Sequence, residues 1–358
     1  MDKKKFILVV NPHYGYTKVA IFNKKGKKVL EKHLDIEGKT IKVYEQKEER
    51  IRSVMNWLKE VKLPLGEIMA VVGRGGILRP TPGGTYKVTY KMLEDLRISY
   101  AGEHVSNLGG IIAHEISRKA DIPSFIVDPM SVDEMMDVAR ISGIPYVDRK
   151  ALSHALNIKY VAEMVSNKLG IEFKQSSFVV AHLGQDFSIV ALKNGKIIDT
   201  NNFYDEGPFS IQRCGSIPPL KIIHMAYNDK KDFKSFLKEI FEESGLVQYY
   251  GTDNYKDIEK YITESNEHSL IVEAMNYNIS KEIGAMCTAL NLEVDQIILT
   301  GPLSKNENVI SYIKKKVSFL GPVKVVPGEY QMEALAKGTL RVLSCEEEAK
   351  IYENEVSI

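Results

Sequence analysis

Short apolar runs alternate with helical patterns along most of the chain. Eight runs have the length and composition of buried strands: FILVV, KVAIF, AVVG, SFIVD, SFVVAH, SIVAL, QIILTG and VKVVPG. Between them, apolar residues recur at spacings of three and four, which predicts amphipathic helices over 48–61, 269–292 and 331–343. Because strands alternate with helices, the pattern predicts an α/β fold.

One arrangement of strands and turns occurs twice. The segments FILVVNPHYGYTKVAIFNKKGKKVLEKHL and SFVVAHLGQDFSIVALKNGKIIDTNNF each contain an apolar strand, a polar turn with glycine, a second apolar strand and a hairpin. The hairpin glycines, Gly26 and Gly195, suit a positive backbone φ. Two hairpins can look alike by chance, but a repeat of this length favours two similar lobes with a ligand-binding cleft between them.

The composition excludes several classes of protein. The 358 residues suggest two or three domains, and the net charge of +1 gives no electrostatic argument for binding nucleic acid or a membrane surface. No apolar run approaches the ~18 residues of a transmembrane helix. The three cysteines are far apart and without a CxxC pair, which fits a reducing cytoplasm. We therefore expect a cytoplasmic protein with neither a nucleic-acid nor a membrane partner.

Charged residues lie in loops that follow apolar strands. Arg74 stands among the glycines of VVGRGG, and Arg213 lies in the irregular loop 206–219. A guanidinium suits bidentate capture of a carboxylate or phosphate, although Arg74 could equally be a surface side chain beside a structural turn. Asp128 follows the strand SFIV, where a carboxylate is costly to bury unless it is paired or binds a metal. Together these groups predict phosphoryl transfer to or from an acid.

Other titratable residues have both a structural and a functional interpretation. A lone histidine such as His104, before a predicted helix, is more often structural, and His154 can serve core or helix-cap packing. Glu333 lies near the start of a predicted helix, where a carboxylate can simply favour the helix dipole. The spacing of the histidines does not predict a metal site. The chain also lacks a GxGxxG after a strand, which argues against a dinucleotide-dependent dehydrogenase.

Many stretches in one colinear order resemble butyrate kinases, which belong to the acetate kinase group of the sugar kinase/Hsp70/actin superfamily. The stretches are VVGRGG, PGGTY, GEHVSNLGGIIAH, DPMSVDEMMDVARISG, HALN, NGKIID, EGPFSIQR, GLVQYYGT, KEIGAM, VSFLGPV and MEALAKGTLRVL. The resemblance implies two ribonuclease-H-like lobes (the actin-like ATPase or acetokinase fold) with a central cleft. It places the N-terminal lobe at 1–150 and the C-terminal lobe at 151–333, with the helix 334–358 packing back on the first lobe.

The resemblance also implies a reaction, its cofactors and its residues. Butyrate and ATP would give butyryl phosphate and ADP with the help of Mg²⁺, in a homodimer or larger homo-oligomer. The catalytic residues would be Arg74, His154, His182 and Arg213. The acid would be bound by Arg74, His104 and Arg213. The nucleotide would lie near Asn11, Thr17, Lys18, Gly184, Ser188 and Gly301. The metal ligands would be Asn11, Asp128 and Glu333.

Three turns on the nucleotide side depart from the family pattern. The family's Asn-Pro-Gly-Ser-Thr-Ser-Thr-Lys is NPHYGYTK here, a run of glycines becomes GQDF, and Thr-Gly-Gly becomes TGP. Side chains fill room that glycine leaves for phosphate, and Asp186 aimed at a phosphate ~4 Å away would cost roughly 1 to 4 kcal/mol. Two functions therefore stay open: an acting carboxylate kinase, or a catalytically impaired relative that binds a carboxylate, an acyl phosphate or a partner protein.

Overall fold

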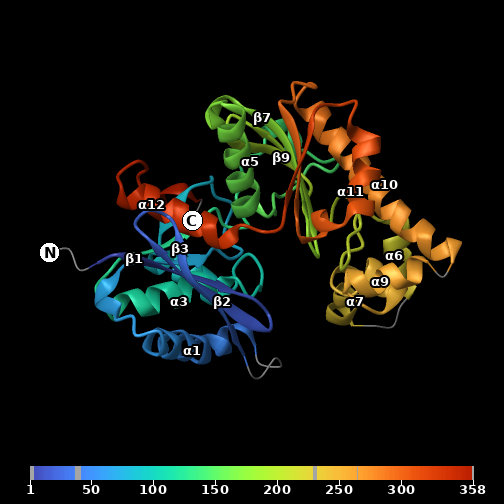
Figure 1. The fold of residues 1–358 in the computed structure, drawn as a ribbon. Coiled ribbons are helices and arrows are strands. Elements are labelled where there is room, and N and C mark those ends of the chain that lie inside the picture. Colours follow the sequence, from blue (N-terminus) through green and yellow to red (C-terminus); the bar gives the residue numbers. More distant parts are fainter. Residues whose placement is uncertain (1–3, 37–41, 229–231, 264, 357–358) are drawn as a thin grey trace. The chain divides into compact units, whose positions relative to one another are not determined.

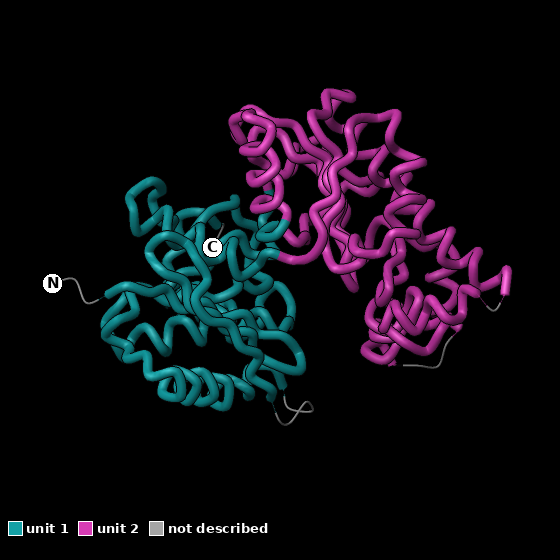
Figure 2. The backbone as a smooth tube through the Cα atoms, viewed as in Figure 1, with its two compact units in different colours: residues 1–133, 155–157, 330–358 teal, residues 134–154, 158–329 magenta. Residues whose placement is uncertain are grey.

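The chain forms two compact units, seen in a computed structural model that describes residues 4–36, 42–228, 232–263 and 265–356 (Figure 2). Unit 1 comprises residues 1–133, 155–157 and 330–358, and unit 2 comprises 134–154 and 158–329. The sequence prediction assigns 134–150 to the first lobe, whereas the structure groups this segment with unit 2. The reason is local bonding: Met136 N–H donates to the carbonyl oxygen of Ile198 (3.0 Å), and Glu134 pairs with Lys159 (2.9 Å).

Unit 1 is built on a seven-stranded sheet with the strand order β12-β5-β6-β4-β1-β2-β3. Three of its strands, β1, β2 and β3, are labelled in Figure 1. β1, β2 and β3 form an antiparallel meander, and β4 and β6 continue the sheet parallel to β1. The strands are β1 (Phe6–Pro12), β2 (Tyr16–Asn23), β3 (Lys28–Asp35), β4 (Ile68–Arg74), β5 (Thr85–Lys87), β6 (Ser124–Val127) and β12 (Lys350–Ile351).

Helices of unit 1 bury their apolar stripes against this sheet. In α1, the predicted stripe is buried at Ile51, Val54 and Leu58, which belong to one core cluster with residues of β1, β2, β4 and α3. Thr89 caps α2 by accepting a hydrogen bond from Met92 N–H. The helices are η1 (Val43–Gln46), α1 (Lys47–Glu60), η2 (Leu65–Glu67), α2 (Tyr90–Arg97), α3 (Asn107–Arg118), α12 (Gln331–Leu343) and α13 (Tyr352–Glu355).

Unit 2 repeats the same plan on a five-stranded sheet with the order β11-β10-β7-β8-β9. β7, β8 and β9 form the antiparallel meander, and β10 and β11 run parallel to β7. The strands are β7 (Ser177–Leu183), β8 (Phe187–Lys193), β9 (Lys196–Thr200), β10 (Gln296–Gly301) and β11 (Val323–Pro327).

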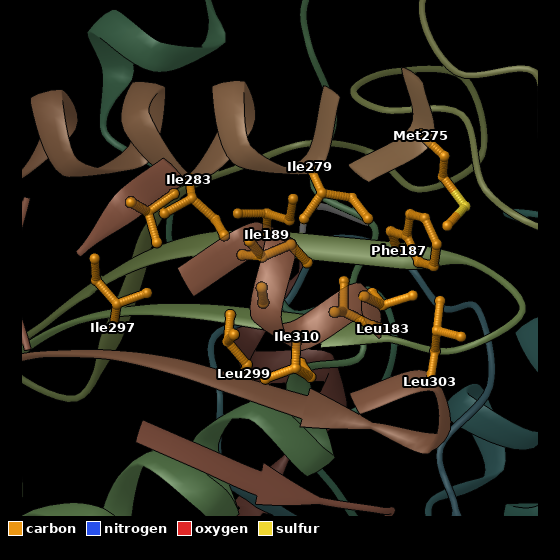
Figure 3. Close-up of a cluster of buried hydrophobic side chains, with 14 of the residues drawn as sticks. Leu183, Phe187, Ile189, Met275, Ile279, Ile283, Ile297, Leu299, Leu303 and Ile310 are labelled. Atoms are coloured by element: carbon orange, nitrogen blue, oxygen red, sulfur yellow. The ribbon is translucent and has the colours of Figure 1, made fainter. Parts of the chain in front are cut away.

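A long helix, α10, covers the core of unit 2. Its stripe of Met275, Ile279 and Ile283 is buried, as the apolar spacing predicts, and Figure 3 shows these side chains beside Phe187 and Ile189 of β8. The helices of the second half are α4 (Asp137–Arg140), α5 (Ala155–Leu169), η3 (Phe173–Gln175), α6 (Pro219–Asn228), α7 (Phe233–Phe241), α8 (Leu246–Tyr250), α9 (Tyr255–Ile262), α10 (Asn266–Ala289), η4 (Pro302–Lys305) and α11 (Glu307–Val317).

The two meanders confirm the internal repeat. Each meander forms one edge of the sheet in its unit. The strand order β3-β2-β1-β4-β6 of unit 1 matches the order β9-β8-β7-β10-β11 of unit 2. The hairpin glycines have the predicted positive φ, 72° at Gly26 and 78° at Gly195. The α/β prediction is therefore confirmed. Among helices of the described ranges, none combines the length and apolar character needed to cross a membrane.

Candidate active site

Asn11, Arg74 and Asp128 lie at the carboxyl ends of three neighbouring parallel strands of unit 1. The registers of β1 with β4 and of β4 with β6 align these three ends, and Asp128 directly follows β6. Ligand sites of open α/β sheets collect at such ends because the loops diverge there. The structure thus brings together three residues that the sequence analysis predicted separately.

Two of these residues present oxygen atoms suited to a hard cation. Asn11 is buried, and its Nδ2 donates to Oε1 of Gln331 (2.7 Å), while its Oδ1 has no hydrogen-bond partner among the described residues. Asp128 is buried with φ 37°, and its Oδ1 accepts from Gly84 N–H (2.7 Å). Oxygen ligands are those that Mg²⁺ prefers, so both residues fit a metal site. For Asn11 the fit is stronger, because a buried oxygen without a partner is costly.

The third predicted metal ligand has a different partner. Glu333, in the first turn of α12, lies 3.0 Å from Nζ of Lys28. In the described part of the chain, no three His, Cys, Asp or Glu side chains are grouped so that they could hold a metal ion. A Mg²⁺ site at Asn11, Asp128 and Glu333 therefore stays a prediction.

The glycines around Arg74 let a helix backbone touch the end of β4. A Cβ added to Gly73 would lie 2.0 Å from the carbonyl oxygen of Gly109, and one added to Gly109 would lie 2.2 Å from that of Arg74. Asn107, at the start of α3, accepts a hydrogen bond from Ile77 N–H at 2.9 Å. Glycine is needed here because the two backbones meet directly, and this contact fixes the backbone that carries Arg74.

The rings in the turn after β1 stack on one another. His13 and Tyr16 have ring centroids 4.6 Å apart, and Tyr16 stacks on His33 at the same distance. Tyr14 is 64% exposed and meets His104 edge-on at 5.7 Å. The stack of His13, Tyr16 and His33 therefore joins the turn to β2 and β3, and stacked rings contribute packing energy beyond their buried area.

Arg50 of α1 supports this turn through hydrogen bonds. The sequence analysis did not predict this role. Its five N–H donors reach the carbonyl oxygens of His13 (2.9 Å) and Tyr16 (3.0 Å), Oγ1 of Thr17 (2.8 Å) and Oε1 of Gln46 (2.7 and 3.2 Å). Burial lowers the pKa of Arg50 to about 10, so it is still charged at pH 7. The available signal was its position four residues before Val54, on the apolar stripe of α1.

Replacing Arg50 by methionine should destabilise unit 1 by at least about 3 kcal/mol, because two carbonyl groups and the Thr17 hydroxyl lose their partner. Chemical denaturation measures this change. Arg52, exposed on the same helix, gives the matched control Arg52→Met, which we expect to stay within about 0.5 kcal/mol of the wild type. Equal stabilities of the two variants would contradict the assigned role of Arg50.

The other predicted residues of unit 1 are held by local partners. Lys18 lies 3.0 Å from a carboxylate oxygen of Glu31. Nδ1 of His104 accepts from Ser106 N–H (3.1 Å) and lies 2.6 Å from the hydroxyl oxygen of Ser106. Because Nδ1 accepts a hydrogen bond, the proton of neutral His104 is assigned to Nε2, the nitrogen that could donate to an acid.

Unit 2 places two predicted histidines face to face. His154 and His182 stack with centroids 4.1 Å apart, and Nε2 of His182 lies 3.5 Å from a carboxylate oxygen of Glu329. Ser188 Oγ accepts from His154 N–H (3.2 Å) and lies 2.8 Å from Nδ1 of that ring. The Ser188 hydroxyl is therefore occupied in orienting His154.

The ends of β7 and β10 hold the predicted glycines Gly184 and Gly301. Gly301 has φ 91°, and an added Cβ would lie 2.4 Å from the carbonyl oxygen of Leu183. Pro302, the departure in this turn, is the first residue of η4. Proline is favoured at a helix start because the N–H it lacks has no partner within the helix, so Pro302 fits this turn.

Arg213 is paired with Asp186, a residue of the altered turn between β7 and β8. Nε of Arg213 lies 2.7 Å from Oδ1 of Asp186 and Nη2 lies 3.4 Å from Oδ2. Nη1 donates to the carbonyl oxygen of Phe241, and the guanidinium lies 5.0 Å from the ring centre of Tyr204. Burial opposes the charge on Arg213, but the ion pair with Asp186, together with the weaker effects of Tyr204 and Glu242, raises the pKa of the guanidinium. The Asp186 carboxylate is thus directed at Arg213.

Comparison with solved structures gives the fold. An acetate kinase of Porphyromonas gingivalis superposes with a TM-score of 0.80 at 19% identity, covering 95% of this chain and all of the other. A propionate kinase of Francisella tularensis gives 0.77 at 18% identity, covering 93% and 98%. These matches define the class by its fold, which is the actin-like ATPase fold predicted from the sequence.

Sequence comparison gives the family. A profile of the acetokinase family matches residues 146–349. The chain is 43% identical to butyrate kinase 2 of Clostridium acetobutylicum over 97% of this chain and 99% of that protein. It is 42% identical to a probable butyrate kinase of Thermotoga petrophila, over 98% and 99%. The chain belongs to the acetokinase family, and the prediction of a butyrate kinase-like carboxylate kinase is confirmed at that level.

Proposed function

We propose that this protein transfers a phosphoryl group between ATP and a short-chain fatty acid, with butyrate as the leading substrate. The observation that carries the proposal is the alignment of Asn11, Arg74 and Asp128 at neighbouring strand ends of unit 1. These residues are an amide, a guanidinium and a carboxylate, which are the groups that an acid, a phosphate and Mg²⁺ require. The resemblance to butyrate kinases assigns His182 and Arg213 to the same reaction. The names of the curated relatives support butyrate.

Phosphoryl transfer to a carboxylate requires positioning of the reactants and neutralisation of their charges. The carboxylate of a fatty acid is ionised at neutral pH, so it attacks phosphorus without a general base. Arg74 would bind that carboxylate, His104 would donate to it, and Arg213 would stabilise the negative charge of the transferred group. His182, stacked on His154, would donate to a phosphoryl oxygen. Mg²⁺ held near Asn11 and Asp128 would neutralise the phosphates when bound.

Several predicted nucleotide residues would act through the turns they support. The Thr17 hydroxyl is bonded to Arg50, and the Ser188 hydroxyl contacts His154. We expect these two residues to hold the shape of their turns, with Lys18, Gly184 and Gly301 nearer to the nucleotide. A cytoplasmic location and a homodimer or larger assembly stay predictions from the sequence.

A second candidate function is a relative that binds an acid or an acyl phosphate without turnover. The observation that favours it is the pairing of Arg213 with Asp186, since this arginine is then neutralised by the chain itself.

Trapping of the acyl phosphate with hydroxylamine distinguishes the two functions. Purified protein with Mg-ATP should form hydroxamate from butyrate, and acetate, isobutyrate and valerate tested in parallel would rank the acids. The Arg213→Ala variant should form almost none, which excludes a contaminating kinase as the source. Absence of product with every acid, from folded protein at high ATP, would contradict turnover and favour the second function.

A further inference from the structure

The Asp186–Arg213 ion pair is enclosed within unit 2. The side chains of Arg213 and Asp186 are 15% and 17% exposed, and three of the five Arg213 donors are engaged with Asp186 and the Phe241 carbonyl. Tyr204 lies over the guanidinium and stacks on Phe241 with centroids 5.2 Å apart. A carboxylate in side-on contact occupies the edge of the guanidinium that also suits a phosphate.

The backbone beneath Arg213 is held in place. Ser210 N–H donates to the carbonyl oxygen of Arg213 (3.0 Å), and Leu246 N–H donates to that of Ser210 (3.1 Å). A Cβ on Gly245 would lie 2.3 Å from the Ser210 carbonyl oxygen and 2.8 Å from that of Arg213, so the two segments touch directly. Any exchange of partners by Arg213 would therefore be a movement of its side chain, with the loop staying in place.

The turn that carries Asp186 is tied to the same loop. Gln212 N–H donates to the carbonyl oxygen of Gln185 (3.4 Å), and Gly184 N–H donates to that of Asp186 (3.2 Å). Nε2 of Gln212 also donates to a carboxylate oxygen of Asp253 (3.0 Å). These bonds keep Asp186 opposite Arg213, and they place a second carboxylate, Asp253, beside the loop with a partner other than Arg213.

We propose that Asp186 competes with phosphoryl ligands for Arg213. The Arg213 side chain must leave its ion pair with Asp186 before it can contact a phosphoryl group. This inference rests on the proposed function for the role of Arg213 in turnover. Because one anion must replace another on the same guanidinium, the wild type should bind phosphoryl ligands more weakly than a variant without the Asp186 charge. Asp186 is a positioning residue, since it acts through Arg213.

The test is equilibrium binding of inorganic phosphate to the wild type and to Asp186→Asn, measured by calorimetry. Asparagine keeps the size of the side chain and removes its charge, so we expect about ten- to a hundredfold tighter binding. The gain should disappear in the double variant Asp186→Asn/Arg213→Ala. Asp253→Asn is the matched control for general loss of negative charge, and its affinity should equal that of the wild type.

Each outcome decides the proposal. Equal affinities of the wild type and Asp186→Asn, a gain that persists without Arg213, an equal gain in Asp253→Asn, or no binding to Asp186→Asn at the highest phosphate concentration would overturn it. Hydroxamate formation, followed alongside, separates the two hypotheses. If the wild type forms hydroxamate but Asp186→Asn binds phosphate with wild-type affinity, the proposed function holds and the competition is excluded. If Asp186→Asn binds phosphate more tightly but neither protein forms hydroxamate, the competition holds and turnover is excluded.

Discussion

Replacement of Arg213 by alanine is expected to lower kcat for acyl phosphate formation by about 10³-fold or more, which is the scale of an arginine that stabilises phosphoryl transfer. The loss should exceed that of a single contact, because Asp186 then keeps its charge without a partner. Both side chains are largely buried, and a buried carboxylate left alone would also repel the phosphates of the nucleotide. Steady-state kinetics with Mg-ATP and butyrate measures the change.

Two further variants show which part of this loss belongs to charge repulsion. Arg213→Lys keeps the charge but loses the planar fork, so its activity should lie between those of the wild type and the alanine variant. Arg213→Ala/Asp186→Asn should regain stability and the part of kcat that is lost to repulsion by Asp186, while the part that depends on the arginine itself stays lost. An alanine variant that folds as the wild type does and keeps a kcat within about tenfold would remove Arg213 from the reaction.

Replacement of Gly109 by alanine is expected to destabilise unit 1 and to disturb Arg74. The new Cβ would lie 2.2 Å from the carbonyl oxygen of Arg74 and 2.7 Å from its nitrogen, so either α3 or the end of β4 must move. Alanine favours a helix over glycine by up to about 1 kcal/mol, whereas overpacking of this kind costs about 1 to 3 kcal/mol or more. A backbone contact this short belongs at the upper end of the overpacking cost, about 3 kcal/mol. After the gain in helix propensity, the net loss in the free energy of unfolding should be about 2 kcal/mol.

The same shift should reduce activity beyond the effect of stability. A displacement of about 1 Å at a group that positions substrate can cost about 10²-fold in rate, so kcat/KM for butyrate should fall by this order in the protein that stays folded. Gly66→Ala is the matched control, since a Cβ there has nothing within 4 Å. Wild-type stability and kinetics in Gly109→Ala would show that α3 does not position Arg74.

Much of the fold could be predicted because its signals are local. The β strands are apolar runs with turns at both ends, and the stripe of α10 follows from the spacing of Met275, Ile279 and Ile283. The repeated meander was visible because Gly26 and Gly195 stand at equivalent places in similar segments. The limits of the compact units were harder to predict, since the segment 134–150 is assigned by its bonds to distant residues such as Ile198 and Lys159.

The residue types of the candidate site were visible in the sequence, but their partners were not. That Arg74 and Asp128 stand at strand ends follows from local patterns, whereas their alignment depends on strand order. Asp186 is recognisable as a departure from a glycine-rich turn, yet the choice between phosphate and Arg213 as its partner depends on a loop 27 residues away. Arg50 was overlooked because a charged residue in an amphipathic helix is ordinarily assigned to the solvent face.

Formation of ATP from butyryl phosphate and Mg-ADP tests the central claim most directly, because it requires the acid, the nucleotide and the transfer step together. We expect ATP to accumulate with the wild type, to disappear when Mg²⁺ is chelated, and to fall by about 10³-fold with Arg213→Ala. No ATP from folded wild-type protein, and none from Asp186→Asn under the same conditions, would contradict the assignment of this chain as a carboxylate kinase.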